Sequence, residues 1–235
     1  MSAARLSTQY NPVAPNSLAV SIGRALEGIE AARLDDLTPE VKGPGVYALY
    51  YVGPCAYYEP LSTLNKEAMR AGLGPIAPIY VGKAMPEGQR SKKVELEDLD
   101  ALLERPILHK RLSEHLGSIE RVDNLLPEHF FARALVLAPV WVRLGESLLI
   151  QRYEPAWNHV VTGFGIHNPG RNRPQKRSDW DTLHHGRAET WSVPLKSGKP
   201  KRAIIKKLEA HWLGWRDRVL ETLSPERRRL LEERL

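Results

Sequence analysis

The chain has a single cysteine, Cys55, among its 235 residues, so it cannot form an intrachain disulfide. This composition fits a reducing compartment such as the cytoplasm, where structural disulfides are rare. Residues 1–16 lack the apolar core of a secretory signal peptide. The longest uncharged apolar stretch, Ala134–Val142, is far shorter than a membrane-spanning helix and contains Pro139. We therefore expect a cytoplasmic protein with no membrane partner.

Several widespread catalytic motifs are also missing. The sequence has no GxxxxGK[ST] phosphate loop, no GxGxxG dinucleotide motif and no GxSxG nucleophile elbow. His184 and His185 are adjacent, but no cysteine pair accompanies them, which argues against a zinc site. We interpret Gly163-Phe164-Gly165 as a flexible turn.

The charge is moderately basic and unevenly distributed. Lys and Arg number 34 against 28 Asp and Glu, a formal net charge of +6, and the pI is about 9.4. Residues 170–177 carry no acid. A second acid-free stretch contains Lys196, Lys199, Lys201, Arg202, Lys206 and Lys207. Both stretches could follow the phosphates of a nucleic acid, or they could form a solvated tail.

Hydrophobic periodicity indicates an α/β (α+β) fold. Apolar runs rich in β-branched and aromatic residues predict strands at 45–52, 78–83 and 129–138. Amphipathic spacing and proline positions predict helices over 17–34, 64–71, 106–119, 139–153, 204–219 and 225–235. The order of the central elements indicates a small three-stranded antiparallel or mixed sheet flanked by helices.

We divide the chain into three parts. Residues 1–40 form an N-terminal extension with one helix, and residues 161–235 form a basic C-terminal extension with two helices. The core, 41–160, carries two long inserts at 53–78 and 84–105. All three predicted strands begin within this core.

Two tripeptides in the predicted strands contain tyrosines. They are Gly45-Val46-Tyr47 and Tyr80-Val81-Gly82. A tyrosine hydroxyl in a buried strand usually has a hydrogen-bond partner. The two tyrosines therefore predict a polar site inside the sheet.

Two basic residues in the predicted 106–119 helix lie one turn apart. Arg111 and His115 share a helical face at the edge of a leucine stripe. They could be an ordinary surface pair, but the planar guanidinium of Arg111 also suits a phosphoryl oxygen. Lys83 follows the second tripeptide, where it could be a surface lysine or could lower the pKa of a neighbouring tyrosine.

Glu146 lies in an apolar setting within the predicted 139–153 helix. An ionised carboxylate there is costly unless a cation or hydrogen bonds compensate it. The compensating cation could be a hydrated Mg²⁺, which often takes one protein carboxylate, or it could be Arg111 or Arg143. Asn158 follows this helix and could simply cap a turn.

In chain order, these residues resemble the landmarks of the GIY-YIG nuclease superfamily. The landmarks are the two tripeptides, Arg111, Glu146 and Asn158, with Val in place of Ile in both tripeptides, over about residues 41–160. The segments GVYALYYVG, PIYVGKA, WNHVVTGFGIHNPG and SDWDTLHHGR are similar to the homodimeric GIY-YIG type II restriction endonucleases that cut CCGCGG. That similarity extends to about residue 190.

The resemblance implies catalytic roles for the two tyrosines and the histidine. Tyr47 would help to activate the attacking water, and Tyr80 would hold that water or the scissile phosphate. His115 would hydrogen-bond Tyr47 and relay a proton. Because an unperturbed tyrosine titrates near pH ~10, Tyr47 as a base needs nearby positive charge, for which Lys83, Arg111 and the metal are candidates.

The resemblance also implies a metal-dependent reaction. Arg111 would stabilise the pentavalent phosphate, and Asn158 would position the phosphate or the metal shell. Glu146 would hold Mg²⁺, with Mn²⁺ able to substitute, near the leaving 3′ oxygen. The expected products are a 5′-phosphate and a 3′-hydroxyl.

The substrate implied by the resemblance is double-stranded DNA. Cutting both strands of a palindrome calls for two sites related by a two-fold axis, so we expect a homodimer. A cognate DNA methyltransferase would belong to the same system, with no direct contact implied. The two inserts and the 170–177 segment would supply DNA contacts. The candidate DNA-binding residues are Arg90, Lys92, Lys93, Arg171, Arg173, Lys176 and Arg177.

Two other functions are compatible with the sequence. The same fold could serve a structure-specific or nicking nuclease of DNA repair or of a mobile element. Alternatively, the chain could be a basic DNA-binding protein without catalysis. The apolar setting of Glu146 argues against the second alternative, since binding alone gives no reason to keep a carboxylate there.

Overall fold

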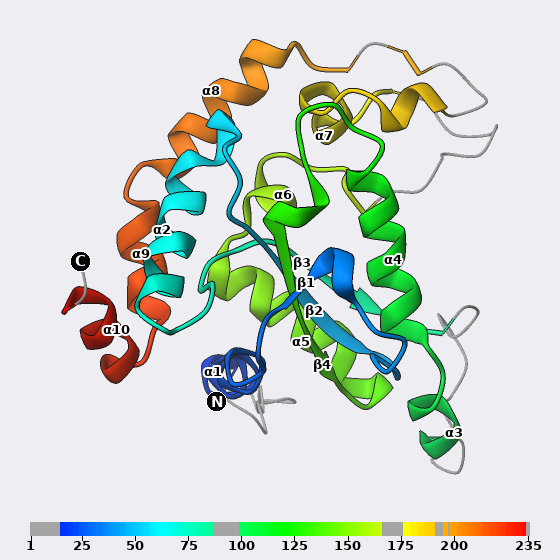
Figure 1. Cartoon of the computed structure of the whole chain (residues 1–235), viewed down its shortest axis with the longest axis vertical. Coiled ribbons are helices and arrows are strands. Elements are labelled where there is room, and N and C mark those ends of the chain that lie inside the picture. The colour runs from blue at the N-terminus through cyan, green and yellow to red at the C-terminus, as the bar shows by residue number, and fades with distance from the viewer. Residues whose placement is uncertain (1–14, 87–98, 166–175, 191–194, 197, 234–235) are drawn as a thin grey trace, which may run out of the picture.

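A four-stranded antiparallel sheet lies at the centre of the computed structural model, with helices on both faces (Figure 1). The structure describes residues 15–86, 99–165, 176–190, 195–196 and 198–233. The strands are β1 (Ala32–Arg33), β2 (Gly45–Tyr51), β3 (Pro78–Ala84) and β4 (Phe130–Val136). Their order across the sheet is β1-β4-β2-β3, so β3 is an edge strand.

Helices account for most of the remaining described chain. They are α1 (Pro15–Glu27), α2 (Glu59–Arg70), α3 (Leu99–Leu103), α4 (Ile107–Ile119), α5 (Pro139–Tyr153), α6 (Ala156–His159), α7 (Asp179–Leu183), α8 (Lys201–Trp212), α9 (Trp215–Thr222) and α10 (Pro225–Glu232). The predicted mixture of helices and strands is confirmed. Within the described part of the chain, no helix combines the length and apolar character that crossing a bilayer requires.

The sheet has one strand more than the sequence predicts. The additional strand, β1, comes from the N-terminal extension and pairs with β4 through Ala32 opposite Ala132 and Arg33 opposite Phe131. Two residues are too few to show a period-two pattern. The preceding helix is correspondingly shorter than predicted, since α1 ends at Glu27, before Gly28.

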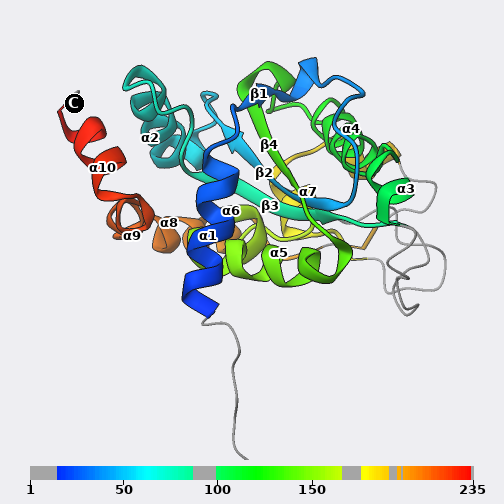
Figure 2. The ribbon, with the colours of Figure 1, turned by 90° about the horizontal axis from the view of Figure 1, so that it is seen from below.

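Strand β2 is buried along its whole length because helices cover both faces of the sheet. Side chains alternate between the faces, so Tyr47 and Tyr51 point one way while Val46 and Tyr50 point the other. The first face packs against α2 and α4, and the second against α1 and α5. Figure 2 shows α1 and α5 together on one side of the sheet and α4 on the other. The register places Tyr47 opposite Gly82 of β3.

The C-terminal extension contains more helices than the two predicted. The predicted 204–219 helix is divided into α8 and α9 at Gly214, whose φ of 63° lies in the left-handed region that favours glycine. The short α7 precedes them, and α10 begins with Pro225 in its first turn. Helices α8, α9 and α10 run beside α2 (Figure 1). Buried residues such as Ile204 and Trp215 belong to the same core cluster as Tyr47.

Candidate active site

The site forms at the edge of the sheet, where β2, β3 and α4 meet. Helix α4 buries Leu108, Leu112, His115 and Ile119, so His115 is part of the core-facing stripe and only 2% exposed. The alternative of a surface Arg/His pair is therefore wrong for His115. Arg111 lies one turn earlier at the border of this stripe, with its side chain 21% exposed.

Tyr47 and His115 form the centre of the site. The Tyr47 hydroxyl oxygen lies 2.6 Å from Nε2 of His115, which confirms the predicted hydrogen bond. Tyr47 is fully buried. A Cβ atom added to Gly82 would lie 2.3 Å from the Tyr47 hydroxyl oxygen. Glycine in the second tripeptide is thus what allows the hydroxyl of the first tripeptide to pass the edge strand and reach the histidine.

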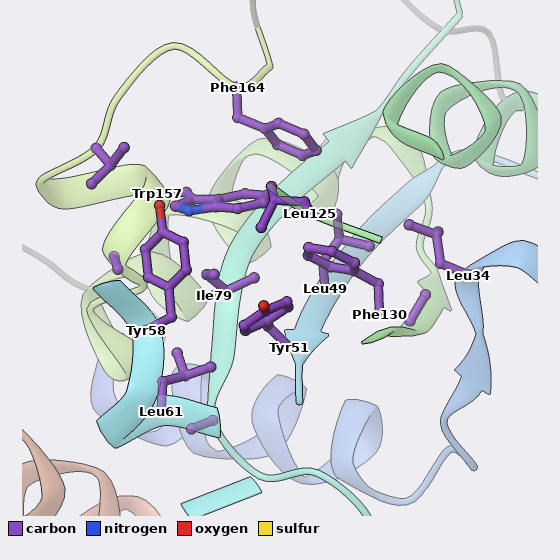
Figure 3. Close-up of a cluster of buried hydrophobic side chains, with 14 of the residues drawn as sticks. Leu34, Leu49, Tyr51, Tyr58, Leu61, Ile79, Leu125, Phe130, Trp157 and Phe164 are labelled. Atoms are coloured by element: carbon purple, nitrogen blue, oxygen red, sulfur yellow. The ribbon is translucent and has the colours of Figure 1, made fainter. Parts of the chain in front are cut away.

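Three aromatic rings enclose the imidazole of His115. The centroids of Tyr47 and Tyr80 lie 5.4 Å and 5.3 Å from it, and Phe164 stacks on it at 4.5 Å with an interplanar angle of 17°. Figure 3 shows Phe164 above the indole of Trp157, at the end of the buried aromatic cluster. The structure thus brings both predicted tyrosines and the histidine together.

The Gly163-Phe164-Gly165 segment belongs to the site, which corrects its interpretation as a flexible turn. Phe164 is 1% exposed. The Gly165 carbonyl accepts a hydrogen bond from Nη2 of Arg111 at 2.9 Å. A Cβ atom on Gly165 would lie 2.5 Å from the Tyr80 hydroxyl oxygen. Gly165 and the buried Phe164 thus fit the turn closely against Tyr80 and His115, an arrangement that a local sequence pattern does not reveal.

Arg111 is held at the site as a cation. Its Nη1 donates to Oε2 of Glu114 at 2.8 Å. Burial alone would lower the pKa of Arg111, but Tyr47 and Glu114 raise it further than burial lowers it. The guanidinium therefore stays charged next to the tyrosine hydroxyls, as stabilisation of a phosphoryl oxygen requires.

Both site tyrosines are phenols rather than phenolates at neutral pH. Burial raises the pKa of Tyr47 well above its usual value, and the neighbouring Tyr80 adds to the increase. Burial also raises the pKa of Tyr80. Among the cations considered as activators of Tyr47, Arg111 does lower its pKa, but burial has the larger effect. Positive charge in this structure therefore does not convert Tyr47 into a free base.

Glu146 lies across the edge strand from the tyrosines. Lys83 is paired with Val46 in the sheet register, so both face α5, and the Lys83 ammonium hydrogen-bonds the Glu146 carboxylate. The cation that compensates Glu146 among the described residues is therefore Lys83, and not Arg111 or Arg143 as the sequence suggested. The Glu146 side chain is 18% exposed and the Lys83 side chain 39%. The negative charge of Glu146 raises the pKa of Tyr47 and of Tyr80, although the carboxylate lies on the other side of the edge strand.

The residues around Glu146 fit a loosely held, hydrated metal ion. Mg²⁺ commonly binds one or two carboxylates and completes its shell with water and substrate phosphates. Glu146 offers one such carboxylate, which is partly exposed and compensated by Lys83. Within the described ranges, no group of three or more His, Cys, Asp and Glu side chains could form a closed metal site.

Asn158 in α6 clamps the edge strand. Its Oδ1 accepts from the backbone N–H of Val81 and its Nδ2 donates to the carbonyl of the same residue, both at 2.8 Å. These bonds differ from the turn cap considered for Asn158 as an alternative. The implied role of Asn158 in positioning the phosphate or the metal shell stays a prediction. Because Val81 lies between Tyr80 and Gly82, Asn158 fixes the strand segment that builds the site.

We expect Asn158→Ala to lower the free energy of unfolding by about 1–3 kcal/mol, because it leaves a backbone donor and acceptor of Val81 without partners. Urea denaturation followed by circular dichroism measures this loss. His159→Ala, one residue further along α6, is the control and should change stability by less than about 0.5 kcal/mol. Equal stabilities of Asn158→Ala and the unmodified protein would contradict the clamp.

A family model described as the Eco29kI GIY-YIG domain matches residues 39–212 of the chain. The chain belongs to this family. The match begins before β2 and ends with α8, so it contains every site residue described above. The family is one of restriction endonucleases, and the chain is accordingly a GIY-YIG nuclease of the restriction type. Comparison with curated proteins finds no match.

The DNA-binding residues predicted for this GIY-YIG nuclease are only partly within the described ranges. Arg90, Lys92, Lys93, Arg171 and Arg173 lie outside those ranges. Their DNA contacts stay a prediction.

The two remaining DNA-binding candidates lie next to α7. Lys176 forms an isolated parallel bridge with Lys196. Arg177 binds Glu189 at 2.6 Å and His185 at 3.1 Å. The Arg177 guanidinium is therefore already engaged by an acid, and it would have to exchange partners to read a base.

His184 of this nuclease is a buried structural residue, a role that the sequence, from which we only argued against a zinc site, did not predict. It is fully buried, with Nε2 2.7 Å from the Tyr58 hydroxyl oxygen and Nδ1 2.8 Å from Oδ1 of Asn124. Since Nδ2 of Asn124 donates to the Leu183 carbonyl, Oδ1 is free to accept from Nδ1–H of the imidazole. Nε2 then accepts from Tyr58, so the neutral imidazole satisfies both bonds.

The burial of His184 predicts a pH-dependent stability. Burial, with smaller contributions from Arg187 and Lys201, lowers the pKa of His184 to about 3. In the unfolded chain a histidine titrates near pH ~6.5. Below that pH the unfolded state binds a proton that the folded state does not, so stability is complete above about 6.5 and falls as the pH decreases. The expected loss is about 2 kcal/mol between pH ~6.5 and ~5.

Urea denaturation at several pH values measures this loss. The His184→Gln variant should lose this part of the pH dependence. The neighbouring His185→Gln variant is the matched control, because the His185 side chain is 55% exposed. A His184→Gln variant whose stability falls with acidification as steeply as that of the His185→Gln variant would show that His184 is not the responsible group.

Proposed function

We propose that this GIY-YIG nuclease is a type II site-specific deoxyribonuclease that cuts both strands of a GC-rich palindrome. The proposed site is CCGCGG, the sequence cut by the restriction enzymes whose segments this chain resembles. The main support is the buried hydrogen bond between Tyr47 and His115, formed beside the cationic Arg111 and across the edge strand from Glu146. In this proposal, these groups would supply a proton path, a positive charge and a metal ligand.

The proposed proton path runs from water through Tyr47 to His115. As the water oxygen attacks phosphorus, its proton passes to the Tyr47 hydroxyl, which donates its own proton to Nε2 of His115. The P–O3′ bond breaks, and the 3′ oxygen takes a proton from solvent, leaving a 5′-phosphate and a 3′-hydroxyl. The elevated pKa of Tyr47 supports this path, because a phenol must pass its proton on at the moment it receives one.

Arg111 and Glu146 have electrostatic roles in this proposal. Arg111 would stabilise the negative charge that builds up on the phosphoryl oxygens, for which its fixed guanidinium is well placed. Glu146 would hold Mg²⁺, or Mn²⁺ in its place, and the bound ion would stabilise charge on the phosphate and the leaving oxygen. Lys83 compensates the carboxylate in the free protein and would be displaced by the metal.

The proposed assembly is a homodimer on double-stranded DNA in the cytoplasm. One site of this kind cuts one strand, so cleavage of both strands of a palindrome requires two sites related by a two-fold axis. A restriction role also requires a methyltransferase that protects the host DNA at the same sequence. That enzyme need not contact this one.

A short duplex with one CCGCGG site, labelled on both strands, tests the proposed function. With Mg²⁺ we expect both strands to be cut at positions related by the two-fold axis of the site, and a duplex with CCCGGG to remain intact. Cleavage of both strands at another sequence would keep the enzyme class and reject CCGCGG. Cleavage of one strand would favour a nicking nuclease, and a retarded but uncut duplex would favour a binding protein.

A further inference from the structure

Two arginines donate hydrogen bonds to the 163–165 turn, which lies next to the proposed catalytic site. Arg187 donates from Nη1 to the Phe164 carbonyl at 2.7 Å and from Nη2 to the Gly163 carbonyl at 3.1 Å. Arg111 donates to the next carbonyl, that of Gly165, at 2.9 Å. Three consecutive carbonyls thus point at guanidinium groups. One of these groups belongs to the proposed catalytic arginine, and the other comes from a separate part of the chain.

Arg187 is itself rigidly held. Its Nε and Nη2 bind Oδ1 of Asp181 at 3.0 Å and 2.8 Å, and the two side chains are only 3% and 2% exposed. The guanidinium carbon lies 4.3 Å from the ring centroid of Trp180. The other carboxylate oxygen of Asp181 accepts from Ser178 Oγ at 2.5 Å. The guanidinium is therefore fixed by an anion, a ring and the turn.

We propose that Asp181 and Arg187 are positioning residues for the nuclease reaction. By fixing the 163–165 turn they hold the Phe164 ring against His115 and the Gly165 carbonyl against Arg111. The catalytic part of this inference rests on the proposed function. Among the described residues, Arg187 contacts the turn, Asp181 and Trp180 and not Tyr47 or His115, so both members of the ion pair would act through the turn.

A contribution to stability does not by itself explain why the Asp181–Arg187 ion pair is buried. Hydrophobic side chains of similar volume often replace a buried ion pair without loss of stability. Such side chains could not bind two carbonyls of a turn at once. The stacked Phe164 ring, with its centroid 4.5 Å from that of His115, transmits the position of the turn to the imidazole whose Nε2 must meet Tyr47. Small errors in such alignment have large effects on rate.

The Arg187→Lys variant tests the proposal, because it keeps the positive charge and loses the planar fork. With saturating DNA and Mg²⁺, we expect the single-turnover cleavage rate to fall by about 10- to 100-fold. DNA affinity, measured with Ca²⁺ in place of Mg²⁺, should stay within about 2-fold of the unmodified protein. The ring-proton NMR shifts of His115 should also change, because they depend on the position of the Phe164 ring.

A second variant covers the case in which Arg187→Lys does not fold. Phe164→Leu leaves the ion pair intact and removes the ring that touches His115, and we expect the same pattern of slow cleavage, normal DNA affinity and altered His115 shifts. Glu27→Gln is the matched control. It alters a buried carboxylate that is bound by the Tyr153 hydroxyl at 2.6 Å, on the α1–α5 side of the sheet. We expect it to lower stability without slowing cleavage.

The outcomes separate the inference from the proposed function. Folded Arg187→Lys and Phe164→Leu proteins with the cleavage rate and His115 shifts of the unmodified protein would overturn the positioning role. So would an equal rate loss in Glu27→Gln, because destabilisation would then explain all three variants. If the unmodified protein cuts no DNA, the proposed function fails, and the His115 shifts alone decide whether Arg187 positions the histidine.

Discussion

Tyr47→Phe is expected to lower the single-turnover rate of DNA cleavage by about 10²- to 10⁴-fold, the range typical of losing a group that transfers a proton. The substitution removes one oxygen atom and with it the hydrogen bond to Nε2 of His115. Because the ring remains and packs in the same core, DNA affinity and fold should be preserved. The measurement is cleavage of a labelled duplex at saturating enzyme, with affinity determined separately in Ca²⁺.

Tyr51→Phe is the matched control for this experiment. Tyr51 lies on the same strand and the same face as Tyr47, is equally buried, and its hydroxyl accepts from the backbone N–H of Cys55 at 3.0 Å. We expect a stability loss of about 1 kcal/mol and an unchanged cleavage rate. A Tyr47→Phe protein that cuts as fast as the Tyr51→Phe protein would remove Tyr47 from the mechanism.

Glu146→Gln is expected to reduce Mg²⁺-dependent cleavage by about 10³-fold or more, since the amide no longer carries the charge that attracts the metal ion. Removing an anion also leaves the Lys83 ammonium without its partner, so binding to the DNA polyanion should be retained or strengthened. Cleavage assays over a range of Mg²⁺ concentrations measure the first effect. Mn²⁺ binding followed by electron paramagnetic resonance measures the metal site without relying on activity.

Glu67→Gln provides a closely matched control. The Glu67 side chain is 17% exposed and binds one cation, Arg216, at 2.8 Å, whereas Glu146 is 18% exposed and binds Lys83. We expect Glu67→Gln to leave cleavage and Mn²⁺ binding unchanged. If both variants lose activity equally, loss of a partly buried ion pair would be the cause, and Glu146 would have no special role in metal binding.

The sequence was sufficient where local patterns determine the structure. Helix α5 was predicted from Pro139 to Tyr153 because proline favours a first turn and Pro155 cannot continue the helix, and the structure has these bounds. The strands containing the two tyrosine tripeptides were also predicted, because their apolar β-branched and aromatic runs are long enough to indicate a strand. The hydrogen bond between Tyr47 and His115 followed from the resemblance to a known family.

The sequence was insufficient where the structure depends on contacts between distant segments. Lys83 and Glu146 are 63 residues apart, and only the register of β3 against β2 places the lysine on the side of α5. Arg187 reaches the Phe164 carbonyl across 23 residues, so nothing local marks the 163–165 turn as part of the site. Likewise, the elevated pKa of Tyr47 arises from burial, which no charge pattern in the sequence predicts.

Digestion of a supercoiled plasmid with one CCGCGG sequence tests whether the protein site formed by Tyr47, His115, Arg111 and Glu146 cuts both strands of DNA with Mg²⁺. We expect the unmodified protein to convert the plasmid to linear DNA in Mg²⁺ and not in EDTA. We expect Tyr47→Phe and Glu146→Gln to leave the plasmid supercoiled over the same time. An intact plasmid after incubation with the unmodified protein and Mg²⁺ would contradict the proposed function, and so would linear DNA produced equally by either variant.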